Sequence, residues 1–151
     1  MENENRVGLG AFACVFNKDF SKVLLLLRNA QTRAREGADW GNVGGKVEFR
    51  ETTMQACIRE VREEIGVDMK PSDLRLIYVI ETPNFKPHIQ AIDFIYAATM
   101  DESQIIKLDS ESERFEWFEI SNLPDRMLAS KEDILGWRDL AKSGSRISQN
   151  Q

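Results

Sequence analysis

Residues 52–66, TTMQACIREVREEIG, constrain the fold more than any other part of the chain, because they carry the start, face and stop signals of one helix. Thr52 fits the N-cap of a capping box with Gln55 at the third helical position, and Gly66 fits the left-handed residue that ends a helix. At about 100° per residue, five apolar residues fall on one stripe. They are Met54, Cys57, Ile58, Val61 and Ile65. The sequence therefore predicts an amphipathic helix that packs one face on a sheet.

The same helix carries three glutamates, Glu60, Glu63 and Glu64, within five positions. Residues three and four apart are neighbours on a helix, so Glu60 faces both of the others, and each like-charge pair costs about 0.2–0.5 kcal/mol. One interpretation is a solvated polar face. The other is a bound Mg²⁺, because this hard cation prefers carboxylate oxygens and would make the same proximity favourable.

Length and composition indicate a globular protein. The 151 residues match one ordinary domain, and 42% of them are hydrophobic, which is enough to bury a core. The net charge of -5 argues against DNA, RNA or an acidic membrane as partner, because phosphate polymers are held mainly by Lys and Arg. The longest aliphatic run, residues 23–27, is too short to span a bilayer, and the first residues lack the pattern of a signal peptide. We therefore expect a cytoplasmic location, with Cys14 and Cys57 as buried free thiols.

Alternating and β-branched runs predict five strands, which are residues 7–16, 22–29, 74–83, 88–100 and 114–120. The first two are separated by NKDFS, which favours a turn and predicts an opening hairpin. A polar loop is expected over 29–42, and a turn around PNFKP between the third and fourth strands.

A terminal helix is predicted over residues 131–142, because apolar residues recur there at helical spacing. The segment that follows, residues 143–151, is polar and is expected to be a frayed tail. The chain is thus predicted to contain a single domain, residues 1–142, and a polar C-terminal tail.

Together with the residues before it, the helix resembles the signature of the Nudix hydrolase family. The family pattern is a glycine, five residues, a glutamate, seven residues, then Arg, Glu, an aliphatic residue, any residue, Glu, Glu, any residue, Gly and an aliphatic residue. Every specified position between residues 45 and 67 is filled. The matching residues are Gly45, Glu51, Arg59, Glu60, Val61, Glu63, Glu64, Gly66 and Val67. Nine positions at fixed spacing leave little room for a chance match.

The resemblance implies an α/β fold, the α/β/α sandwich of this family with a mixed central β-sheet. The strands on both sides of the signature agree with it, as does the Trp-Phe step at Trp117 and Phe118. One departure is visible, because many members have a proline just before the paired glycines, where this sequence has Val43. That difference alters the entry to the loop and removes no catalytic group.

The resemblance also implies a chemistry. Mg²⁺, with Mn²⁺ as a substitute, would be held by Glu60, Glu63 and Glu64, would bind a diphosphate and would activate a water for attack on phosphorus. Arg59 and Glu51 are expected to orient the cluster. The two glycines before the signature, Gly44 and Gly45, would let the backbone approach a phosphate closely.

The general base is open between a glutamate of the signature and a carboxylate of the later segment DSESERFEWF. The candidates there are Glu111 and Glu113, because the family often adds a carboxylate shortly before the Trp-Phe step. Both residues are equally well interpreted as solvated loop acids. His88, the one histidine, is interpreted as structural or as a contact to substrate.

The leading hypothesis for function is a Mg²⁺-dependent pyrophosphohydrolase that cleaves the phosphoanhydride of a nucleoside diphosphate linked to another group. Pro83, sixteen residues beyond Val67, hints at ADP-ribose-type substrates, whereas WGNVGGKVE resembles members that hydrolyse nucleoside triphosphates. The alternative is a noncatalytic nucleotide-sensing domain on the same fold. A small nucleotide is the expected partner of a monomer or homodimer, with no nucleic acid polymer and no membrane.

Overall fold

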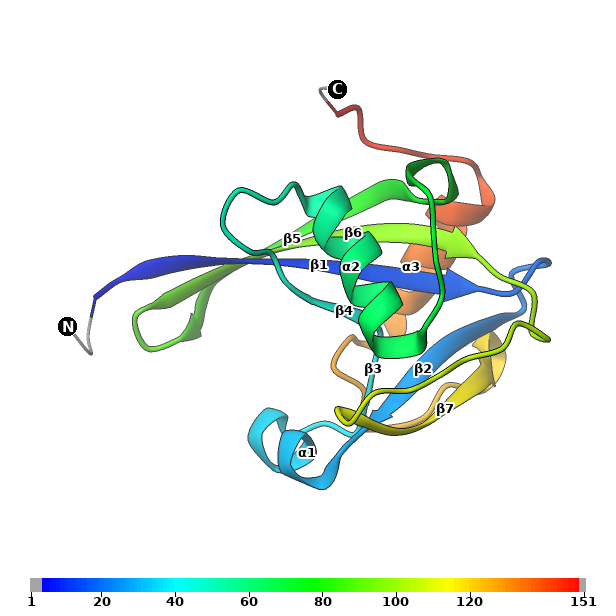
Figure 1. The fold of residues 1–151 in the computed structure, drawn as a ribbon, viewed down its shortest axis with the longest axis horizontal. Helices are drawn as coiled ribbons and strands as arrows, with labels where there is room; N and C mark the ends of the chain where they lie inside the picture. The colour runs from blue at the N-terminus through cyan, green and yellow to red at the C-terminus, as the bar shows by residue number, and fades with distance from the viewer. Residues whose placement is uncertain (1–3, 150–151) are drawn as a thin grey trace.

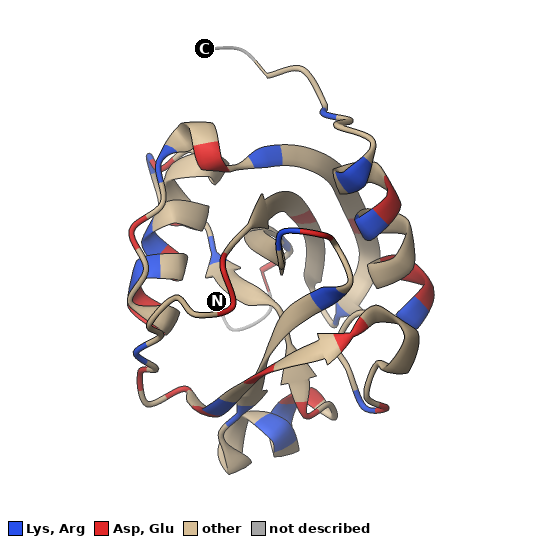
Figure 2. Cartoon of the chain, turned by 90° about the vertical axis from the view of Figure 1, so that its right-hand side faces the viewer, with Lys and Arg blue, Asp and Glu red and all other residues tan. Residues whose placement is uncertain are grey.

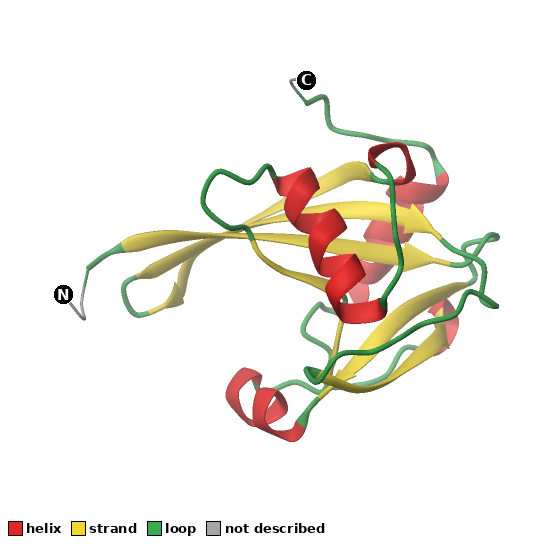
Figure 3. Cartoon of the chain, viewed as in Figure 1, coloured by secondary structure: helices red, strands yellow, loops and turns green. Residues whose placement is uncertain are grey.

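The computed structural model describes residues 4–149, and its strands form one seven-stranded sheet (Figures 1 and 3). The strands are β1 (Arg6–Phe16), β2 (Lys22–Arg28), β3 (Trp40–Gly41), β4 (Val43–Lys46), β5 (Arg75–Lys86), β6 (Ile89–Thr99) and β7 (Ser112–Glu119). Their order is β3-β2-β1-β6-β5, with β4 also paired to β1 and β7 to β2. The β1–β6 pair is parallel and the other pairs are antiparallel, so the sheet is mixed, as predicted.

Helices cover both faces of this sheet. They are α1 (Ala30–Glu36), α2 (Thr53–Ile65) and α3 (Lys131–Lys142), with short 3-10 turns η1 (Pro71–Asp73) and η2 (Ile120–Asn122). Figure 1 shows α2 in front of the sheet and α3 behind it, and Figure 2 shows the two helices on either side of the strands. This arrangement is the expected α/β/α sandwich. None of the helices between residues 4 and 149 is long and apolar enough to cross a membrane.

The alternation of β1 places one apolar cluster on each face of the sheet. Ala13 and Val15 pack with Val61 and Ile65 on the α2 face. On the α3 face, Cys14 and Phe16 pack with residues of α3, which are Ile134, Trp137 and Ala141. Each helix is therefore fixed to the sheet by its own core.

The signals that predicted α2 are confirmed. Thr52 Oγ1 accepts a hydrogen bond from Gln55 N at 3.0 Å, and Gln55 Oε1 accepts one from Thr52 N at 2.9 Å. Gly66 adopts a left-handed conformation with φ 68° and donates its N–H to Arg62 O at 3.0 Å. The predicted apolar stripe faces the sheet, since Cys57, Val61 and Ile65 are fully buried and Met54 and Ile58 are partly buried.

The polar loop predicted over 29–42 is wrong in part, because α1 occupies its first half. Asn29 caps this helix by accepting a hydrogen bond from Thr32 N at 2.8 Å, and Gly37, with φ 70°, ends it. The helix itself has no buried residue. Without an apolar stripe the periodicity of a helix is invisible in sequence, although the two capping residues were a usable signal.

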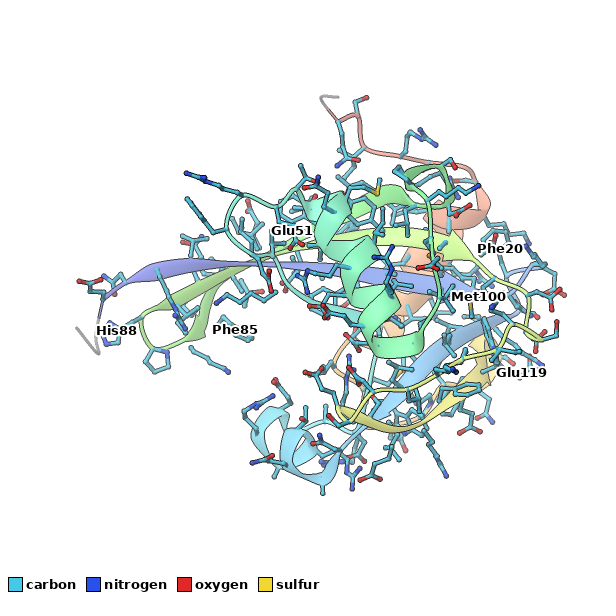
Figure 4. The ribbon with its side chains drawn as sticks, in the orientation of Figure 1. Phe20, Glu51, Phe85, His88, Met100 and Glu119 are labelled. Atoms are coloured by element: carbon cyan, nitrogen blue, oxygen red, sulfur yellow. The ribbon has the colours of Figure 1, made fainter. Side chains whose placement is uncertain are left out.

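The predicted hairpins differ from the observed ones in their pairing. β1 and β2 follow one another, but their registered pairing is confined to Phe16 and Val23, because β1 pairs along its length with β6 and β2 pairs with β7. The turn between β5 and β6 is Pro87 and His88, since β5 continues to Lys86. Figure 4 places His88 at the tip of this hairpin, away from Glu51.

The segment after α3 is not frayed over residues 143–149. Ile147 donates its N–H to Leu76 O at 2.7 Å, and Gln149 Nε2 donates to Tyr96 Oη at 2.9 Å. Arg75 Nη1 also donates to Ser145 O at 3.1 Å. These contacts bind the polar segment to β5 and β6, and residues 150–151 lie outside the described part of the chain.

Two glycine substitutions test the end of α2 and the interior of α3. One should lower the free energy of unfolding and the other should raise it. We expect Gly66→Ala to destabilise the protein by about 1–2 kcal/mol, because alanine is strained in the left-handed region and its Cβ would lie 3.0 Å from Lys107 Cβ. Gly136→Ala should stabilise it by about 0.5–1 kcal/mol, because Gly136 lies inside α3 and an added Cβ meets no atom within 4 Å. Urea unfolding measures both. Equal midpoints for the two variants would contradict the assignment of these helices.

Candidate active site

Arg59 gathers three carboxylates beside α2. Its Nε and Nη2 donate to the two oxygens of Glu51 at 2.7 and 2.9 Å, and its Nη1 donates to Glu60 Oε1 at 2.9 Å and Glu63 Oε2 at 3.3 Å. Nη2 also donates to the carbonyl oxygen of Lys46 in β4, at 2.9 Å. These hydrogen bonds lower the pKa of Glu51 and raise that of Arg59. We call Arg59, Glu51, Glu60 and Glu63 the Arg59 cluster.

Gly45 makes room for one member of this cluster. A Cβ built on Gly45 would lie 2.7 Å from Glu60 Oε1, closer than side-chain atoms approach one another. The carboxylate of Glu60 therefore lies directly against the backbone of β4, with 13% of the side chain exposed. The lack of a side chain at Gly45, which was expected to admit a phosphate, therefore also admits the carboxylate of Glu60.

Glu64 lies apart from the Arg59 cluster, in a buried ion pair with Arg28 of β2. The Arg28 Nη1–Glu64 Oε2 distance is 2.6 Å, and the Glu64 side chain is 1% exposed. The backbone N–H of Gly44 donates to Glu64 Oε1 at 3.1 Å. Burial raises the pKa of Glu64 to about 7, and the hydrogen bonds from Arg28 and Gly44 oppose that rise.

Arg28 makes two further hydrogen bonds besides the one to Glu64. Nη2 donates to the carbonyl oxygen of Asn42 at 2.6 Å, and Nη1 reaches Ser112 Oγ at 3.2 Å. Neither Arg28 nor Ser112 is among the catalytic or metal-binding residues predicted from the sequence. The arginine that closes the aliphatic run of β2 was a signal, because a charge that continues a buried strand needs a partner. Ser112 carries no comparable signal, since its role depends on the pairing of β7 with β2.

Glu111 and Glu113, the two candidates for general base in the segment DSESERFEWF, do not join the Arg59 cluster. Glu113 lies 3.2 Å from Arg33 Nη1 of α1, measured from its Oε2. The register of β2 and β7 is irregular at this point, where Arg28 is paired with Ser112 and Leu27 with Arg114. Among residues 4–149, neither Glu111 nor Glu113 forms a hydrogen bond or ion pair with the Arg59 cluster.

The three glutamates of the signature thus form ion pairs with two different arginines. Glu60 and Glu63 contact Arg59, and Glu64 contacts Arg28. Within the described residues, no three Asp, Glu, His or Cys side chains are gathered closely enough to hold a metal ion. Each arginine supplies the positive charge that offsets the repulsion expected along α2.

Comparisons with known proteins agree with the fold and the signature. A model of the NUDIX domain matches residues 6–137. The chain therefore belongs to the Nudix hydrolase family, as the resemblance predicted. Among solved structures, a MutT NUDIX hydrolase from Burkholderia pseudomallei matches with a TM-score of 0.71 at 24% identity, covering 87% of this chain and 98% of that one. A MutT protein from Methanosarcina mazei matches with a TM-score of 0.71 at 22% identity, over 92% and 97%.

Curated relatives match this chain over 73 to 122 residues. The chain is 32% identical over 99 residues to the ADP-ribose pyrophosphatase of Methanocaldococcus jannaschii, covering 64% of this chain and 57% of that protein. It is 37% identical over 73 residues to the dihydroneopterin triphosphate diphosphatase of Escherichia coli, covering 48% and 45%. It is 26% identical over 122 residues to the m7GpppN-mRNA hydrolase of Saccharomyces cerevisiae, covering 78% and 11%. The chain thus spans between about a tenth and about a half of the length of these relatives.

The buried ion pair is tested by removing its members singly and together. We expect Arg28→Met to destabilise the protein by about 3–5 kcal/mol, because it leaves the buried Glu64 without a counter-charge. The double variant Arg28→Met, Glu64→Leu should recover most of that loss. Urea unfolding gives the four free energies of the cycle.

The control for this cycle lies on the same helix. Arg62 and Asp68 form an ion pair at 2.7 Å with 63% and 81% of their side chains exposed, so Arg62→Met should change stability little. A loss of stability at Arg28 no larger than that at Arg62 would show that the Arg28–Glu64 contact is not the anchor described.

Proposed function

We propose that the chain is a Mg²⁺-dependent pyrophosphohydrolase that cleaves the phosphoanhydride of a small nucleoside diphosphate derivative. The observation that carries this proposal is the Arg59 cluster, in which one guanidinium donates hydrogen bonds to Glu51, Glu60 and Glu63 and to the carbonyl oxygen of Lys46 in β4. Arg59 offsets the repulsion among these carboxylates, and the set of oxygen donors that it holds together is of the kind that a hard divalent cation binds. Membership of the Nudix hydrolase family supports the same chemistry.

The donor types of the site suit a hard divalent cation, although the carboxylates of the described residues are not gathered closely enough to hold one as they lie in the structure. Glu60, Glu63 and Glu64 offer only oxygen ligands, which Mg²⁺ prefers and Mn²⁺ accepts. The glycine at position 45 leaves space at the carboxylate of Glu60, where a larger residue would fill it. These three glutamates would hold the metal once their side chains move closer together than they lie between residues 4 and 149 of the structure. When bound, the cation would neutralise charge on the phosphates and make a water molecule more acidic.

The residues of the chain itself have separate tasks in this proposal. Arg59 is a positioning residue, because its fork fixes the carboxylates of Glu51 and Glu60 relative to β4. Arg28 is the positioning residue for Glu64, to which it donates a hydrogen bond from the end of β2. We place the general base among the glutamates of the signature, with Glu63 the most accessible at 54% exposure. Glu113 is the weaker candidate, since it is paired with Arg33.

The substrate is proposed as a class. Relatives named for ADP-ribose, dihydroneopterin triphosphate and CTP all act on a phosphoanhydride of a small nucleotide-like molecule. Relatives named for mRNA or capped RNA also match. A small nucleotide is proposed here because the chain has a net charge of -5, which disfavours a polymer of phosphates.

A substrate panel tests the proposal. Nucleoside triphosphates, ADP-ribose, nucleotide sugars, dinucleoside polyphosphates and a capped RNA oligonucleotide would each be incubated with Mg²⁺, with Mn²⁺ or with EDTA. We expect metal-dependent release of a nucleoside monophosphate from at least one small nucleotide. Glu60→Gln should lower kcat by about 100-fold or more, because it removes a charged ligand. The matched control, Glu132→Gln, alters an exposed glutamate of α3 and should leave kcat unchanged.

The same panel distinguishes the enzyme from a nucleotide sensor. If every substrate stays intact while the folded protein binds nucleotide and Glu64→Gln leaves that binding unaltered, the chain is a sensor and the hydrolase proposal fails. Hydrolysis by Glu60→Gln at the same kcat as wild type would also contradict it.

A further inference from the structure

The N-terminal part of β1 and the β5–β6 hairpin extend together beyond α2 and α3, which cover the rest of the sheet (Figure 1). We call residues 5–7 and 83–90 the arm, because they lie side by side at this end of the molecule. They line a cavity of about 680 Å³. Sites for small molecules typically measure roughly 300–1,000 Å³, so the cavity is large enough for one.

Basic side chains line the cavity of the arm. Arg6 and Lys86 are cations, His88 becomes one when it is protonated, and no Asp or Glu is among the described residues that line the cavity. In the whole chain, by contrast, 25 Asp and Glu outnumber 20 Lys and Arg. Neither Arg6 nor Lys86 forms an ion pair with a carboxylate of residues 4–149. The cavity therefore concentrates positive charge in an acidic protein.

The register of the strands places the two cations on one face of the arm. Ile89 of β6 is paired with Arg6 of β1 on one side and with Lys86 of β5 on the other. Residues that are directly paired across strands share a face, and neighbouring strands lie about 4.8 Å apart. The Cα atoms of Arg6 and Lys86 are thus about 10 Å apart, and both long side chains can reach one anion held over Ile89.

Contacts within the arm fix the positions of its polar groups. Lys86 Nζ lies 5.1 Å from the centroid of the Phe85 ring, which attracts the ammonium group. His88 Nδ1 lies 2.9 Å from Asn5 Oδ1, and Arg6 N donates to His88 O at 2.9 Å. Because Asn5 Oδ1 only accepts, Nδ1 is the donor and Nε2 of His88 is left for another partner. Figure 4 shows Phe85 and His88 in this hairpin.

The backbone of His88 favours a different residue at this position. Pro87 and His88 form the turn between β5 and β6, and His88 has φ 65°, the left-handed conformation that glycine adopts most readily. The hydrogen bond between His88 and Asn5 is exposed, so it contributes little to stability in competition with water. The imidazole is thus retained where glycine would fold at least as well, and this indicates a role in binding.

We propose that the cavity of the arm binds the phosphate group of a small organic molecule, with Arg6 and Lys86 as its cationic contacts and His88 Nε2 as a third contact. Guanidinium and ammonium groups are the side chains that recognise phosphate most often. The cavity is much larger than a phosphate ion, and the amides of Asn84 and Gln90 line the space for the rest of the molecule.

This site is separate from the Arg59 cluster. Arg6 is an even number of positions from Cys14, which packs on the α3 face, so alternation along β1 places Arg6 on that face as well. The Arg59 cluster lies beside α2, on the opposite face of the sheet. The inference therefore does not depend on the proposed hydrolysis.

Titration of the ¹⁵N-labelled protein with ADP, inorganic phosphate or adenosine in EDTA tests the proposal by NMR. We expect ADP to shift the backbone amide resonances of the arm in a saturable way, inorganic phosphate to shift them at higher concentrations, and adenosine to leave them unchanged.

Variants of the arm identify the contacts. Arg6→Met and Lys86→Met should each weaken ADP binding by about 5-fold or more, because each removes a charged donor. The control, Lys142→Met, alters an exposed lysine of α3 and should leave the affinity unchanged. His88→Gly should also weaken binding, yet unfold at the same urea concentration as wild type or a higher one.

Three results would overturn the inference. One is the absence of ADP-dependent shifts in the arm, and the second is an equal loss of affinity in Lys142→Met and Lys86→Met. The third is a short RNA oligonucleotide that binds the arm more tightly than ADP, which would assign the cations to a polymer. Because EDTA removes the metal, none of these results bears on the substrate panel that tests the proposed hydrolase.

Discussion

The buried contact between Arg28 and Glu64 is the interaction on which the arrangement of the site depends. It joins the end of β2 to α2. Glu64 also accepts a hydrogen bond from Gly44 of β4, and Arg28 donates to Asn42, which precedes β4, and to Ser112 of β7. Two charges buried together are costly unless all their hydrogen-bonding groups are satisfied, and here four elements supply the partners. The helix that carries the signature therefore has one position relative to the free edge of β4.

The negatively charged glutamates of α2 therefore have two different sets of partners. Glu64 is neutralised from the sheet, whereas Glu60 and Glu63 are held by Arg59 nearer to solvent. Gly45 lets Glu60 approach the backbone of β4, where a side chain would block it. The repulsion that marks this helix in the sequence is thus offset by two arginines of different origin, one local and one from a distant strand. A divalent cation would add to that compensation where the carboxylates are most accessible.

The sequence predicted what depends on local signals and missed what depends on strand pairing. The bounds and face of α2 follow from Thr52, Gln55 and Gly66, and the Arg59–Glu63 contact follows from helical spacing. Arg28 and Ser112 are 84 positions apart, and their meeting depends on the pairing of β7 with β2. Sheet pairings between distant segments are not encoded in any one window of residues, which is why the β1–β6 pairing and the place of Glu113 were also missed. The short helix α1 was missed for a local reason, because it has no apolar stripe.

The central claim is that the carboxylates of α2 bind a divalent cation, and it is tested most directly by Mg²⁺ titration of the free energy of unfolding. A ligand that binds only the folded state stabilises it by about 2.7 kcal/mol at a hundred times its dissociation constant. We expect urea midpoints to rise with Mg²⁺ concentration in wild type and in Glu132→Gln, and to stay level in Glu60→Gln. A wild-type midpoint that is insensitive to Mg²⁺, or an equal rise in Glu60→Gln, would contradict the account.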